Sequence, residues 1–326
     1  MQPLRIPIRR RAALTALGGV VMADAGAQPA WPSRPVRLVV PSTPGGAMSG
    51  AAAILAAALG RRWHQRLNLQ FLPGYGTVTA TLAVARSPAD GLHLGLATSA
   101  LAINAALRGS LPYDTLADLA PVSLLADFQY AVYAHRSLPV RNAGELVSHA
   151  RHSRLPIRYA SPGIGTGAHV AMESFAYEAG IRVAHVPFLS AVFAEKAVLG
   201  GDVPFLAYGV PTSIAAAMAG PLRLVALMGR KTVVDIQGVP WASNAVRGFE
   251  LTGNIGVIAP RAVPAPLLRR LGEDLAASMR EPDVRSAMAD LGLQATGLAA
   301  ADSESHLRAD IARWRLVGQV TGIRLD

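Results

Sequence analysis

Two glycine-rich segments are places where the backbone itself could bind a ligand. Residues 44–46 read Pro-Gly-Gly and residues 161–167 read Ser-Pro-Gly-Ile-Gly-Thr-Gly, each between a short β-type run and a helical stretch. Glycine lets the chain turn sharply, and a helix start offers unpaired N–H groups to a carboxylate or phosphate. Hydroxyls flank both segments, on Ser42, Thr43, Ser161 and Thr166. The two segments together predict a binding site for a small anion that needs no salt bridge. The alternative is that their glycines and hydroxyls serve only in turns and helix caps.

Two other groups of side chains have spacings that would suit a metal ion. Glu145, His149 and His152 would share one face of a helix, and Asp302, His306 and Asp310 have a similar helical spacing. Imidazoles and carboxylates ligate zinc in such patterns, but a solvated helix face has the same composition. We therefore predict no resident metal.

Catalytic chemistry has little support in the sequence. Ser161 and His169 could form a hydrolase pair, but no G-x-S-x-G elbow and no obvious acidic partner accompany them. The chain contains no Cys, which excludes a thiolate nucleophile and a Cys-based zinc site. Residues 163–167 do not follow the G-x-G-x-x-G pattern of a dinucleotide site. We predict that the protein is not an enzyme and has no cofactor.

Alternating strands and helices must position the glycine-rich segments. The apolar runs and turn signals predict two successive units of α/β type with parallel strand pairing. Strands are expected at 36–40, 67–72, 92–98, 157–160, 183–186, 203–207 and 222–227, and helices at 47–62, 77–87, 143–151, 168–179, 191–199 and 212–219.

Two long extended stretches, 122–134 and 251–258, are expected to cross between the units, with three C-terminal helices at 266–279, 282–291 and 302–321 packing back on the first unit. We therefore predict two lobes: residues 28–129 plus 252–326 form lobe 1, and residues 130–251 form lobe 2. Ligands in open α/β sheets bind beyond the carboxyl ends of the strands. The predicted site is the cleft between the lobes.

Residues 1–27 have the pattern of an export signal. Four arginines among residues 5–11 precede an apolar run at 12–23 and an A-x-A cleavage pattern ending at Ala27. The run is too short for a membrane-spanning helix, which needs about 20 apolar residues. An uncleaved anchor is the alternative, and both the Sec and the twin-arginine routes fit the arginines. We predict a periplasmic protein cleaved near Ala27.

The charge of the chain does not predict a nucleic-acid partner. Removing residues 1–27 takes away four arginines and Asp24, which lowers the formal net charge from +10 to about +7. The remaining arginines are scattered, without a basic helix or an aromatic-interleaved stripe. Without Cys the chain cannot carry a lipid anchor on that residue. We expect a monomer that binds no nucleic acid.

The chain resembles the Bug-type periplasmic solute receptors of the tripartite tricarboxylate transporter family. No single match is decisive, but their order and spacing along the chain are specific. The matching segments are residues 31–41, 44–46, 73–76, 89–91, 111–114, 120–124, 137–140, 165–169, 185–187, 282–285 and 311–314.

This resemblance implies a two-lobed, type II periplasmic-binding-protein fold of the Venus-flytrap kind. It implies a receptor that binds a small carboxylate and hands it to membrane permease subunits. A ligand sensor that signals to a membrane receptor on the same fold is the alternative. The ligand-binding residues carried over by position are Ser42, Thr43, Gly45, Gly46, Ser49, Gly74, Gly76, Thr98, Ser99, Asn104, Ser161, Thr166, Gly167, His169 and Tyr208.

Several positions depart from the family pattern. The first loop usually reads like PFPPGGxxD, but here Ser42, Thr43 and Ser49 stand at its aromatic, proline and acidic positions. Tyr208 replaces an aspartate, and Asn254 replaces a common aromatic. These changes leave the fold prediction intact but not the ligand prediction: the alternatives are a different acid, a neutral amide, or no ligand.

Overall fold

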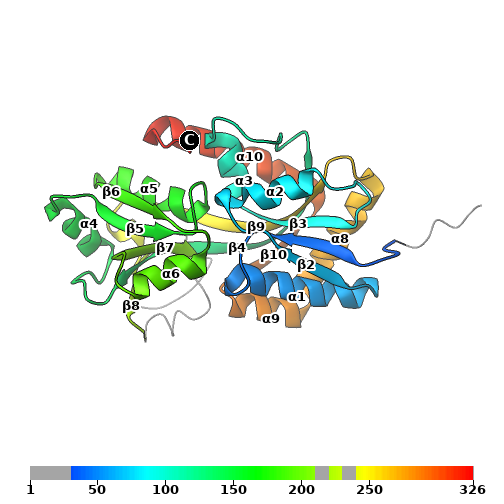
Figure 1. Cartoon of the computed structure of the whole chain (residues 1–326), viewed down its shortest axis with the longest axis horizontal. Helices are drawn as coiled ribbons and strands as arrows, with labels where there is room; N and C mark the ends of the chain where they lie inside the picture. The colour runs from blue at the N-terminus through cyan, green and yellow to red at the C-terminus, as the bar shows by residue number, and fades with distance from the viewer. Residues whose placement is uncertain (1–30, 210–219, 230–239, 326) are drawn as a thin grey trace, which may run out of the picture.

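A computed structural model describes residues 31–209, 220–229 and 240–325. The predicted signal segment and the helix expected at 212–219 lie outside these residues. Figure 1 shows two groups of strands and helices side by side, joined in the middle by long strands. We refer to the groups as the first and the second lobe.

Three parallel strands form the start of the first lobe: β1 (Val36–Val40), β2 (Leu67–Phe71) and β3 (His93–Thr98). Four of the five β1 residues are buried, because helices cover both faces of the sheet (Figure 1). These helices are α1 (Gly46–Trp63), α2 (Val78–Ala85) and α3 (Ala100–Leu107), with a short 3-10 turn η1 (Tyr75–Thr77) before α2.

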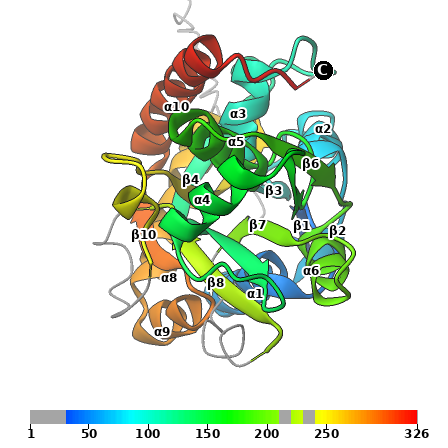
Figure 2. The same ribbon diagram turned by 90° about the vertical axis from the view of Figure 1, so that its left-hand side faces the viewer.

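The second lobe repeats this architecture with β5 (Ile157–Ser161), β6 (Val183–Pro187) and β7 (Phe205–Gly209), in which β5 pairs in parallel with both neighbours. The strand β8 (Leu222–Leu227) lies beside them, antiparallel to β4. Among the described residues, the helices around these strands (Figure 2) are α4 (Ala143–His152), α5 (Gly167–Ala179) and α6 (Ala191–Leu199).

Two long strands connect the lobes. The strand β4 (Leu119–His135) pairs antiparallel with β9 (Thr252–Pro260) over its first part, from the Leu119–Pro260 pair to the Gln129–Thr252 pair. From Tyr130 onward β4 pairs with β7 and β8 instead. The sheet is therefore mixed at its centre, unlike the parallel pairing expected from the sequence, because β4 leaves the first lobe and β9 returns to it.

The C-terminal elements return to the first lobe. The helices α8 (Ala265–Arg280) and α9 (Pro282–Asp290) contact α1, and α10 (Ala300–Thr321) packs on α3 and β4. A short strand, β10 (Gln294–Leu298), pairs antiparallel with β4. In the described part of the chain, no helix is both long and apolar enough to cross a membrane.

The sequence-based assignment missed α3 and β10. Of the ligand-binding residues predicted here, Thr98 ends β3 and Asn104 lies inside α3. The helix forms because residues 100–107 are Ala, Leu, Ile and a single Asn, and the Asn104 amide donates to the Ala100 carbonyl one turn earlier at 2.7 Å.

Candidate ligand site

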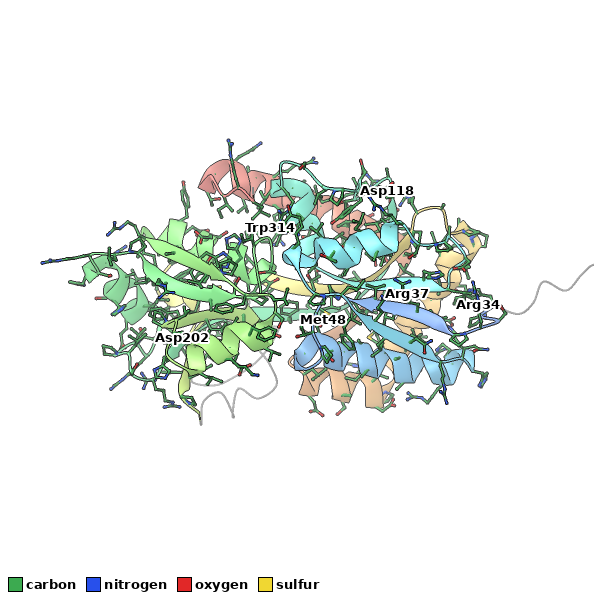
Figure 3. All side chains as sticks on the ribbon, viewed as in Figure 1. Arg34, Arg37, Met48, Asp118, Asp202 and Trp314 are labelled. Atoms are coloured by element: carbon green, nitrogen blue, oxygen red, sulfur yellow. The ribbon has the colours of Figure 1, made fainter. Side chains whose placement is uncertain are left out.

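A cavity lies between the lobes and draws its walls from both. It encloses about 890 Å³ of space free of protein atoms, part of which is open solvent. Met48, at the start of α1, lies at the boundary between the lobes in Figure 3. Seven of the sequence-predicted residues line this cavity: Ser42, Gly74, Gly76, Thr98, Thr166, Gly167 and Tyr208.

The first glycine-rich segment brings the start of α1 to this cavity. Gly45 and Gly46 have φ angles of 91° and 80°, which favour glycine, and the helix begins at Gly46. A Cβ on Gly46 would lie 3.7 Å from the Tyr208 hydroxyl of the second lobe. Thr43 Oγ1 donates to Ser190 Oγ at 3.1 Å. Thr43, Gly45, Gly46 and Ser49 therefore frame the helix start without lining the cavity.

The loop after β2 touches the second glycine-rich segment directly. Gly74 and Gly76 have positive φ angles, and a Cβ on Gly76 would collide with the Ile164 carbonyl oxygen. Buried Asn104 ties the two loops together, since its amide donates to Gly76 O at 2.9 Å and to Gly165 O at 3.4 Å. Asn104 therefore acts as a brace between the lobes and does not line the cavity.

The two hydroxyls of the second segment already have protein partners. Thr166 Oγ1 donates to Gly163 O at 2.7 Å and accepts from the His169 N–H at 3.4 Å, which caps α5. Ser161 Oγ lies 2.6 Å from His185 Nε2 and accepts from the Gly163 N–H at 3.1 Å. Thr166 lines the cavity, whereas Ser161 is fully buried and does not.

A buried stack of rings lies behind this loop. The His169 ring stacks on His185 with centroids 4.1 Å apart, and His185 stacks on Tyr159 at 5.0 Å. Burial lowers the pKa of His169 to about 4, and burial followed by the charge of His169 lowers the pKa of His185 to about 3. Both imidazoles are therefore neutral near pH 7. The Ser161–His169 pair, which the sequence analysis considered and did not favour, is not formed, because Ser161 contacts His185 instead.

Hydroxyls around β3 and β7 have separate roles. Buried Ser99 accepts the backbone N–H of Asn254 at 2.9 Å, and so holds β9 against β3. Thr98 Oγ1 accepts from the Ala100 N–H at 3.2 Å, at the cavity wall. Burial, followed by the nearby Glu195, raises the pKa of Tyr208 to about 12, so this residue presents a neutral phenol where the family pattern has an acid.

The two candidate metal groups are engaged in protein contacts. Glu145 accepts the backbone N–H of Arg141 at 2.7 Å and lies at the start of α4. His306 pairs with Asp310 at 3.4 Å, and Asp310 also accepts from the Asn254 amide at 3.1 Å. Within the described ranges, no group of three or more His, Asp or Glu could hold a metal ion.

Several cavity residues were not predicted from the sequence. They come from elements far apart along the chain, and only Pro41, Ala47, Thr77, Pro162 and Ala168 lie in or next to the segments that the sequence analysis singled out. They are Pro41, Ala47, Met48, Thr77, Phe128, Tyr130, Pro162, Ala168, Leu189, Ser190, Ala191, Gly209, Ile255 and Leu293. Phe128 and Ile255 do lie in the extended stretches expected to cross between the lobes, which is the one signal that could have found them.

Two α/β lobes around a shared cavity define a periplasmic binding protein of the Venus-flytrap type. The sequence signature described as "Tripartite tricarboxylate transporter family receptor" (TctC) matches residues 52–323. The chain belongs to this family, as a Bug-type receptor.

The similarity to individual members extends over most of the chain. Protein BugT of Bordetella pertussis is 27% identical over 96% of this chain and 98% of its own length. A UPF0065 protein of Bordetella bronchiseptica is 28% identical over 90% of this chain and 88% of its own length. Rpa4515 from R. palustris, whose structure contains adipate, is 28% identical in sequence. The match covers 90% of this chain and 99% of the Rpa4515 chain, with a TM-score of 0.85.

Proposed function

We propose that this protein binds a small organic acid in the cavity between its lobes and delivers it to permease subunits of the tripartite tricarboxylate type. The observation that carries the proposal is the convergence of four helix starts on one cavity. Two belong to the first lobe, α1 and α2, and two to the second, α5 and α6.

These helix starts suit a negatively charged ligand. None of the four helices has an acidic residue in its first turn. Of these four helices, only α5 has its start capped by a side chain in the residues that the structure describes. The N–H groups and dipoles of helix starts stabilise an anion. Because helix starts of both lobes would contact the same bound anion, the ligand would favour the closed arrangement of the lobes.

Three further facts support a carboxylate and an exported receptor. The related Rpa4515 structure contains adipate, which is a carboxylate, and the matched family consists of transporter receptors. Residues 1–27 have the composition of an export signal. We therefore place the mature chain in the periplasm, as a monomer that needs neither a cofactor nor a nucleic acid.

Binding can be tested by thermal unfolding of residues 28–326 with mono-, di- and tricarboxylates and with the matching amides. A ligand present at one hundred times its Kd adds about 2.7 kcal/mol to the free energy of unfolding. At least one acid should raise the melting temperature in a concentration-dependent way, and its amide should have less effect. If no acid in the panel raises the melting temperature, the proposal is wrong.

Delivery to a permease needs a separate experiment. Membrane vesicles from the source cells should take up the radiolabelled ligand only when the mature chain is added outside. Uptake that is equally fast without the added chain would contradict a role in delivery while leaving ligand binding intact.

A further inference from the structure

The turn between β2 and α2 has a strained backbone. Tyr75, Gly76 and Thr77 have φ angles of 50°, 60° and 76°, so three consecutive residues lie in the left-handed region. Glycine adopts this region readily. It is unfavourable for Tyr75 and most of all for Thr77, because a β-branched side chain is a genuine outlier there. Two of the three residues of this turn are therefore strained.

Hydrogen bonds on several sides hold the strained turn in place. The Thr77 N–H donates to Gly74 O at 3.1 Å, and Thr81 Oγ1 donates to Thr77 O at 3.0 Å. The Asn104 amide donates to Gly76 O at 2.9 Å. Backbone strain that surrounding contacts enforce in this way clusters at ligand sites and switch regions. The turn therefore calls for a functional reason.

The strained turn brings Thr77 to the cavity between the lobes. Thr77 lines this cavity and comes directly before the first residue of α2. A threonine in this position usually caps the helix by accepting a backbone N–H of its first turn. In the described part of the chain, the Thr77 side chain makes no such bond. Its hydroxyl is not used by the helix and is available to a ligand.

We propose that Thr77 is a ligand-binding residue whose hydroxyl donates a hydrogen bond to a carboxylate oxygen of the bound acid. This inference rests on the proposed function, namely that the cavity binds an acid. The left-handed φ of Thr77 fixes the direction of its Cβ and of the first N–H groups of α2, so the strain is the cost of placing both at the cavity. For folding alone glycine would be more favourable at this position, because it relieves the strain.

Three variants of residues 28–326 separate the hydroxyl from the strain. Thr77→Val removes the hydroxyl and keeps the branched shape, Thr77→Ser retains the hydroxyl, and Thr77→Gly removes both the hydroxyl and the strain. Isothermal titration with hexanoate, adipate, malate and citrate identifies the acid that the parent binds most tightly. For that acid, Thr77→Val and Thr77→Gly should bind at least about tenfold more weakly, since the lost bond joins a hydroxyl to a charged group. Thr77→Ser should bind nearly as the parent does.

Urea unfolding distinguishes this role from a structural one. Thr77→Gly should have a higher unfolding midpoint than the parent although it binds the acid more weakly, because the left-handed strain is relieved. Thr79→Val is the matched control: Thr79 is exposed on α2 and lies outside the cavity lining, so affinity and midpoint should both stay parental.

Two results would overturn the inference and leave the proposed function standing. One is parental affinity in Thr77→Val, and the other is an unfolding midpoint of Thr77→Gly below that of the parent. If the parent binds none of the four acids, the inference and the proposed function fail together.

Discussion

Replacing Gly167 with alanine should weaken ligand binding through a collision behind the cavity wall. Gly167 is the first residue of α5, and a Cβ there would run into the hydroxyl and ring of Tyr130. Tyr130 is only 3% exposed. The Phe128 ring lies 5.0 Å from its centroid, and a Cβ on Gly253 would lie 2.7 Å from its hydroxyl. Tyr130 is confined on these sides, so either its ring moves into the cavity that both residues line or the start of α5 shifts, and both changes alter the binding site.

The size of this effect follows from the cost of overpacking. Forcing a methyl group into a well-packed site costs about 1–3 kcal/mol. If this whole free-energy cost is lost from ligand binding, the affinity falls about fivefold to about 150-fold. Isothermal titration of the tightest acid would measure the loss, and urea unfolding would measure how much of the cost appears in stability.

Gly60→Ala is the matched control. Gly60 lies inside α1, and the nearest atom to a Cβ there is the Gln65 carbonyl oxygen at 3.4 Å, an ordinary contact distance. Alanine favours a helix interior over glycine by about 0.5–1 kcal/mol, so this variant should be slightly more stable and bind as the parent does. Parental affinity and stability in Gly167→Ala would refute the packing argument.

Two more predictions concern the braces around the loops. Asn104→Leu removes the donors to Gly76 O and Gly165 O. In urea unfolding, the free energy of unfolding should therefore fall by about 1–3 kcal/mol. An unchanged unfolding midpoint would show that these hydrogen bonds do not stabilise the protein. The free energy of unfolding should rise with pH between about 4 and 6.5, because His169 and His185 bind protons more readily in the unfolded chain. Each of the two contributes a slope of up to about 1.4 kcal/mol per pH unit. The variant His169→Gln should flatten this slope in urea titrations at pH 4.5, 5.5 and 6.5, and the parental slope in the variant would contradict the assignment.

Sequence patterns predicted the elements that local composition determines. The apolar run at β1, the glycines before α1 and α5, and the Thr166 cap are all local features, so their signals are visible in the residues themselves. The two successive α/β units and the two extended stretches also led to the prediction of two lobes, and the family resemblance added the Venus-flytrap type of the fold.

The missed features depend on contacts between distant residues. Ser161 pairs with His185 and not with His169 because β5 and β6 lie in register, which brings Ser161 opposite Pro187 and Tyr159 opposite His185. Leu293 reaches the cavity only because the chain returns to the first lobe after α9. The spacing of residues along the sequence does not indicate which distant residues come into contact.

The most direct test is a crystal structure of residues 28–326 with the acid of the panel that binds most tightly. We predict the acid in the cavity between the lobes, with a carboxylate beside the first turns of α1 and α5. An acid bound outside the cavity, or bound in it with no carboxylate near a helix start, would contradict this description of the site.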